Sequence, residues 1–86
     1  MIQFIIDGLP EPEISRRVEV EVRRTLRQLG KGGEWDIVLL ASDTRDVWDL
    51  GLRGPSGHRR FTWFAATAPE EIPARAVEHV RRLIES

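Results

Sequence analysis

The sequence predicts a single α+β domain over residues 1–86, a two-layer sandwich with the element order β-α-β-β-β-α. Three observations support this prediction. Apolar residues alternate with period two in four short segments, and they recur at helical spacing in two longer ones. Turns rich in glycine or proline separate several of these segments. A chain of 86 residues is long enough for one domain and too short for two.

The first strand and the first helix follow from different periods. Residues 1–7 alternate apolar and polar side chains, which is typical of a strand with one buried face. Residues 13–29 are ambiguous at first, because the stretch from Val18 to Val22 alternates as a strand does. Over the longer window the helical spacing prevails, and Gly30 is a natural stop. The predicted buried stripe holds Ile14, Val18, Val22, Thr25, Leu26 and Leu29.

The second half of the chain predicts the rest of the sheet and the last helix. Residues 34–41 are apolar on both faces, as in an interior strand. Residues 47–53 and 58–66 flank Gly54-Pro55-Ser56-Gly57 and predict a hairpin. We expect a capping box at Thr67–Glu70 to open the last helix, with Pro73 either inside its first turns or restarting it.

The connections between these segments predict the sheet. A right-handed crossover through the first helix makes the first two strands parallel, and the later strands add antiparallel neighbours. The result is a four-stranded mixed sheet with two helices packed on one face. The order of the strands is left open.

The composition of the chain limits the classes of function that it can have. The net charge of −1 and the pI near 6.1 argue against a dedicated nucleic-acid binder. The lack of cysteine excludes disulfides, thiolate zinc sites and a cysteine nucleophile. The first residues resemble a strand more than a signal peptide, and no apolar stretch approaches the roughly 20 residues that span a bilayer. We therefore expect a cytoplasmic protein without a membrane partner.

The second face of the sheet leads to the main functional hypothesis. If both helices cover one face, apolar residues remain on the other, unless the twist of the sheet or the last helix covers them. The last strand contributes either Phe61 and Trp63 or Thr62 and Phe64. Such a patch is typical of a non-enzymatic module that binds a protein partner or a second copy of itself. The predicted interface residues are Ile5, Val38, Leu40 and Trp63.

The alternative function is nucleic-acid or polyanion binding. Every cation except Lys31 is arginine, which fits guanidinium groups that hold phosphates and also fits a GC-rich genome. Glu19 and Glu21 stand three or four residues from arginines of the predicted first helix, a spacing that allows ion pairs on an ordinary solvated face. The predicted contacts, on that helix and around the hairpin tip, are Arg16, Arg23, Arg24, Arg27, Arg53, Arg59 and Arg60.

The sequence holds little that points to catalysis or to a bound metal. Asp43, Asp46 and Asp49 recur at a spacing of three, whereas a calcium loop needs ligands at alternate positions around a glycine. His58 and His79 are the only histidines, and no serine has an obvious base beside it. We expect no catalytic residue, cofactor or metal.

One turn is similar to part of a known family. The segment Gly54-Pro55-Ser56-Gly57-His58, with Phe61 beyond it, resembles the turn that precedes a strand in double-stranded RNA-binding domains. The α-β-β-β-α order from residue 13 is also similar. In that family two strands follow the turn, lysines open the last helix, and no strand precedes the first helix. Here one strand follows, Glu70 and Glu71 open the helix, and a strand comes first. No RNA-contacting residue is transferred from that family.

Overall fold

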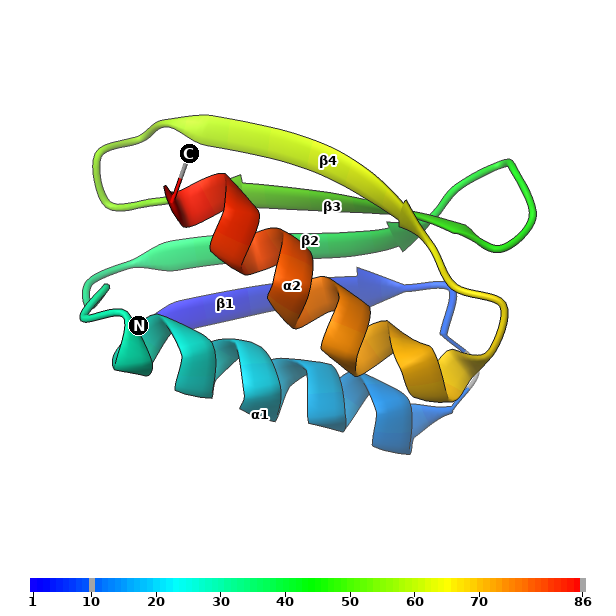
Figure 1. Cartoon of the computed structure of the whole chain (residues 1–86). Helices are drawn as coiled ribbons and strands as arrows, with labels where there is room; N and C mark the ends of the chain where they lie inside the picture. Colours follow the sequence, from blue (N-terminus) through cyan, green and yellow to red (C-terminus); the bar gives the residue numbers. More distant parts are fainter. Residues whose placement is uncertain (10, 86) are drawn as a thin grey trace.

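The computed structural model describes residues 1–9 and 11–85 and confirms the predicted element order (Figure 1). A single sheet has the strand order β1-β2-β3-β4, with β1 parallel to β2 and the other neighbours antiparallel. The strands are β1 (Ile2–Asp7), β2 (Trp35–Ala41), β3 (Val47–Arg53) and β4 (Arg59–Ala65). The helices are α1 (Pro12–Gln28), the short 3-10 turn η1 (Pro69–Glu71) and α2 (Ile72–Glu85).

Both long helices cover the same face of the sheet and run side by side in the same direction (Figure 1). The buried side chains of α1 are the predicted stripe, except that Leu29 lies beyond the helix end and is half-buried. Each fully buried Leu, Ile or Val contributes about 1.5–3 kcal/mol through loss of water contact. The core between the layers is completed from the sheet and from α2 by Ile37, Leu39, Trp48, Leu50, Leu52, Phe64, Ile72, Ala76 and Val80.

Local chemistry explains where α1 begins and ends. Pro12 occupies the first helical turn, where a missing N–H leaves no bond unmade. At the other end Gly30 adopts φ 68°, the left-handed conformation that glycine tolerates best. The N–H of Lys31 then donates to the Leu26 carbonyl at 2.9 Å, and that of Gly30 donates to Arg27 at 3.1 Å. This is the Schellman arrangement that terminates many helices.

The predicted capping box at the start of the last helix is wrong. Ala68 caps η1, and no side chain makes a capping hydrogen bond there. The N–H of Glu71 instead donates to the Ala68 carbonyl at 3.0 Å, which closes one 3-10 turn around Pro69. The α-helix begins only at Ile72, with Pro73 in its first turn. Pro73 thus restarts the helix after η1, since a residue in the first helical turn needs no partner for its N–H.

Candidate binding surfaces

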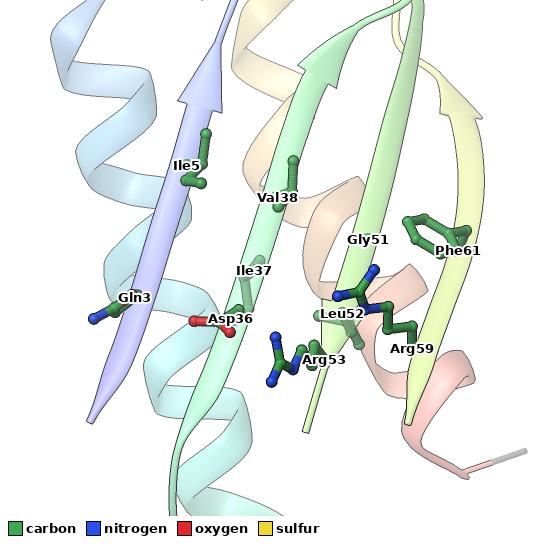
Figure 2. A pocket seen from close by; sticks show the side chains of 10 residues that line it. All are labelled: Gln3, Ile5, Asp36, Ile37, Val38, Gly51, Leu52, Arg53, Arg59 and Phe61. Carbon is green, nitrogen blue, oxygen red and sulfur yellow. The ribbon is translucent and has the colours of Figure 1, made fainter. Parts of the chain in front are cut away.

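The face of the sheet opposite the helices is open, and the strand register places its side chains in three rows, of which Figure 2 shows the central row and the arginine row. Each row runs across all the strands from β1 to β4. The central row contains Ile5, Val38, Gly51 and Phe61. The aspartate row contains Asp7, Leu40, Asp49 and Trp63. The arginine row contains Gln3, Asp36, Arg53 and Arg59.

The predicted interface residues all lie on this open face. Trp63 is 64% exposed, Ile5 62% and Leu40 37%, while Val38 is half-buried between its neighbours. The last strand turns Phe61 and Trp63 outward, and Phe61 is the most exposed of these side chains at 74%. Large apolar residues gathered at this exposure are unusual on a surface that contacts only water.

A shallow hollow of about 350 Å³ lies over the central and arginine rows. Gly51 forms its floor because it has no side chain, and the Phe61 ring leans toward it from β4 (Figure 2). A Cβ on Gly51 would stand 3.0 Å from Cε1 of Phe61 and 3.9 Å from the Val38 Cβ. An aromatic ring over a cross-strand glycine helps to fix the register of the two strands. The central row is therefore apolar with a recess in its middle.

The arginines predicted on the first helix are exposed along one face of α1. Arg23 lies 3.8 Å from Glu19, and Arg24 lies 3.5 Å from Glu21. The guanidinium group of Arg23 also stands over the Phe4 ring, 5.2 Å from its centroid. Exposed ion pairs of this kind contribute about 0–1 kcal/mol, so a phosphate can replace the carboxylate at little cost. The exposed candidates on α1 are Arg16, Arg23, Arg24 and Arg27.

The arginines predicted at the hairpin tip do not form one cluster. Arg53 and Arg59 are directly paired across β3 and β4 on the open face. Arg60 follows Arg59 in the strand and lies on the helix side, where it donates a hydrogen bond to the Leu83 carbonyl near the end of α2. The alternation of a strand explains this split, because neighbouring residues point to opposite faces.

One end of the molecule is basic. The turn after α1, the β3–β4 turn and the end of α2 meet there (Figure 1). Arg81 donates to the Gln28 side chain at 3.4 Å across the two helices, and a Cβ on Gly33 would lie 2.8 Å from Pro55. Carboxylates at this end are Glu34, Asp36 and Glu85, and Glu78 binds Arg82 at 2.8 Å. The cations at this end, which we call the basic end, are Arg27, Lys31, Arg53, Arg59, Arg60, Arg81 and Arg82.

The opposite end is acidic. The loop after β1, the β2–β3 loop and η1 meet there, and the β2–β3 loop lies beside residues 66–72 (Figure 1). The cations of this end are Arg45 in the β2–β3 loop and Arg16 and Arg17, which lie beside Glu13 on α1. The carboxylates of this acidic end are Asp7, Glu11, Glu13, Asp43, Asp46, Asp49, Glu70 and Glu71. A net charge of −1 thus conceals a separation of charge along the molecule.

A second hollow, of about 370 Å³, lies at the basic end. Lys31, His58 and Arg60 line it together with the Trp35 ring. The indole N–H of Trp35 is buried and has no hydrogen-bond partner among the described residues. The hollow therefore combines cationic side chains with an aromatic ring in its wall.

His79 is a packed side chain of α2. Its ring stacks on Phe64 with centroids 5.3 Å apart and an interplanar angle of 13°. Burial lowers the pKa of His79, the charge of Arg82 lowers it further, and Glu78 opposes the shift. In residues 1–9 and 11–85 no group of three or more His, Asp or Glu side chains could hold a metal ion. No helix in the same ranges is long and apolar enough to cross a membrane.

Fold and surfaces together define a class: a two-layer α+β module with paired helices on one face and an open, partly apolar sheet on the other. No model of a protein family matches this chain, and no curated protein matches it significantly. Among solved structures, the chain is similar to a ribosomal subunit interface protein from Coxiella burnetii. The TM-score is 0.65, the match covers 98% of this chain and 93% of that one, and the sequences are 13% identical. At this identity the likeness shows the fold.

Proposed function

We propose that the chain is a non-enzymatic RNA-binding module that associates with the ribosome through phosphate contacts from α1 and the basic end. The main support is the separation of charge along the molecule. A net charge near zero is a poor guide when one end of the molecule has an excess of cations and the other an excess of carboxylates. The basic end and the arginine face of α1 together present a surface to which an RNA backbone can bind.

The geometry of α1 suits a sugar-phosphate backbone. Arg16 and Arg27 are separated by about 17 Å along the axis at the ordinary helical rise, with Arg23 and Arg24 between them. Guanidinium groups bind phosphate oxygens through two parallel N–H donors. Lys31 and Arg81 extend the same surface past the helix end. Double-stranded RNA is recognised chiefly through its shape and its phosphates, and such a surface needs no base-reading side chains.

The structural neighbour supports the ribosome as the partner. The Coxiella burnetii protein is described as a ribosomal subunit interface protein, and its fold is shared over nearly the whole of both chains. Ribosomal RNA is structured and highly anionic, which matches the surface described above.

The test is the salt dependence of RNA binding. Fluorescence anisotropy with a labelled ribosomal RNA hairpin should give an affinity that falls linearly with salt on logarithmic axes. The double variant Arg23→Gln/Arg27→Gln removes two phosphate contacts and should reduce the slope by about 1.8. The matched control Arg45→Gln/Arg75→Gln removes the same charge from the β2–β3 loop and the start of α2, nearer the acidic end. This control should change the salt slope little. Binding that ignores salt, or an equal loss in both variants, contradicts the proposal. Co-sedimentation with ribosomes tests the partner.

A second candidate function is binding to a protein through the open face of the sheet. The exposure of Phe61, Trp63 and Ile5 supports it. Substituting Val38 or Leu40 with a charged residue should then abolish association and leave the fold intact. Association unchanged by these substitutions counts against this candidate.

A further inference from the structure

We propose that the open face of the sheet is a two-fold interface with a second copy of this chain, in which the aspartate row of each copy lies on the arginine row of the other. This inference shares only Arg53 and Arg59 with the proposed RNA contact, whose other residues lie on α1 and around the ends of the two helices. The RNA test uses α1 residues and the dimer test uses open-face residues, so failure of one proposal can be told from failure of the other.

The order of the rows makes the face complementary to itself. The central row lies between the aspartate row and the arginine row along the strands. A two-fold axis along the central row, perpendicular to the strands, returns the central row to itself and exchanges the outer two. Asp49 then faces Arg53 of the second copy, and Trp63 faces its Arg59. These are an ion pair and a cation–π contact.

The central row supplies the apolar contact in the same arrangement. Ile5, Val38 and Phe61 each lie against their own equivalents, and the Phe61 ring of each copy already lies over its own Gly51. An interface between identical copies is most often isologous, with one patch serving both partners. Sheets that pack face to face keep their strands within about 30° of each other, which is compatible with this register.

Other occupants fit less well. A two-fold axis along the strands would set Asp36 against Arg53 but would also lay the aspartate row of each copy on that of the other, which gathers four carboxylates in a row without a cation. A single strand of RNA could stack on Phe61 and Trp63. However, Asp49 is the direct cross-strand partner of Trp63, and carboxylates outnumber guanidinium groups in the three rows. This face therefore repels a phosphate chain more than it attracts one.

The area fits a weak, reversible dimer. Ordinary strand spacing and rise give the three rows a footprint of about 20 by 20 Å. Two copies together would then bury about 800 Å², which is less than stable interfaces bury and is in the range of weak, transient ones. We expect a dissociation constant in the micromolar range, so the dimer should form and dissociate within an accessible concentration series.

Charge reversal provides the test, measured by sedimentation velocity from low micromolar to several hundred micromolar protein. Asp49→Arg alone places arginine against Arg53, and Arg53→Glu alone places glutamate against Asp49. Each single variant should raise the dissociation constant about tenfold or more, because like charges then face each other at both ends. Mixed in equal amounts, the two variants should form a heterodimer, since every facing pair is again opposite in sign. The double variant Asp49→Arg/Arg53→Glu should dimerise as the wild type does.

Matched controls lie off this face in the β2–β3 loop. Asp43→Arg and Arg45→Glu make the same charge changes on exposed residues and should leave the dimer intact. Thermal unfolding establishes that every variant is folded. A wild type that stays monomeric throughout overturns the proposal. So does a dimer that survives both single reversals, or a mixture that fails to recover association. Monomers that bind a single-stranded oligonucleotide in a Phe61-dependent manner would assign the face to nucleic acid instead.

Discussion

Removing two carboxylates from α1 should strengthen RNA binding. Glu19 and Glu21 lie 3.8 Å from Arg23 and 3.5 Å from Arg24, so each carboxylate competes with phosphate for a guanidinium group. In the double variant Glu19→Gln/Glu21→Gln both arginines are released from this competition. Each ion pair stabilises the helix by only about 0.2–0.5 kcal/mol, so the fold should tolerate the change.

The size of the gain follows from the ion pairs that RNA binding must break. Arg23 and Arg24 contact phosphate in both proteins, so the logarithmic salt slope should stay nearly the same, and the variant is spared the cost of separating two pairs, about 0.2–0.5 kcal/mol each. At a given salt concentration its affinity should therefore be about two- to fivefold higher than that of the wild type. Anisotropy titrations of one labelled RNA hairpin at several salt concentrations measure this difference.

The control separates a local effect from a global one. Glu70→Gln/Glu71→Gln changes the net charge equally but at the acidic end, remote from the proposed contact. An equal gain from the two double variants would mean that only the net charge matters, and our account of the surface would be wrong. If Glu19→Gln/Glu21→Gln gives no gain in RNA affinity, Arg23 and Arg24 do not contact the RNA.

Two further predictions concern stability. Gly30→Ala should lower the free energy of unfolding by about 1 kcal/mol, because alanine is strained at φ 68° and an added Cβ has nothing within 4 Å to contact. Chemical denaturation measures this loss. An unchanged free energy of unfolding would contradict the left-handed helix ending at Gly30. The lowered pKa of His79 means that the folded chain binds a proton less readily than the unfolded chain. The contribution of His79 to stability should therefore be full above pH 6.5, the ordinary pKa of a histidine, and should be lost as the pH falls through the lower pKa of the folded state. His79→Phe keeps a ring against Phe64 and should flatten that part of the profile, whereas an identical pH dependence in the variant would assign it to other groups.

Local periodicity was sufficient to predict the elements and their faces. The apolar stripe from Ile14 to Leu26 predicted α1 correctly, although Val18 to Val22 alternates as a strand does. Of the three valines in that alternation, Val18 and Val22 are buried on the stripe, and Val20 is 48% exposed, as a helix requires. Strand alternation likewise placed Ile5, Val38 and Leu40 on one face. Both patterns are properties of neighbouring residues, so they can be read without knowing the rest of the fold.

Features that depend on how distant segments meet could not be read in this way. Either Phe61 and Trp63 or Thr62 and Phe64 could face outward from β4. The register of β4 against β3 decides between them, and the turn sets that register, whereas the alternation of the strand does not. The capping box failed because Pro69 favours a 3-10 turn before the helix. The separation of charge required the parallel course of α1 and α2, which gathers Lys31 and Arg81 at one end.

The two proposed contacts are physically compatible because α1, which carries Arg23 and Arg24, lies on the layer opposite the open face of the sheet. A dimer formed through the sheet would leave α1 of both copies facing outward, so each copy could still contact RNA. The two associations should also respond differently to salt. Phosphate contacts weaken steeply as counterions compete, whereas the central row of Ile5, Val38 and Phe61 is apolar and little affected by ions. Moderate salt should therefore release RNA first and leave the dimer, so the two contacts can be separated in one preparation without any substitution.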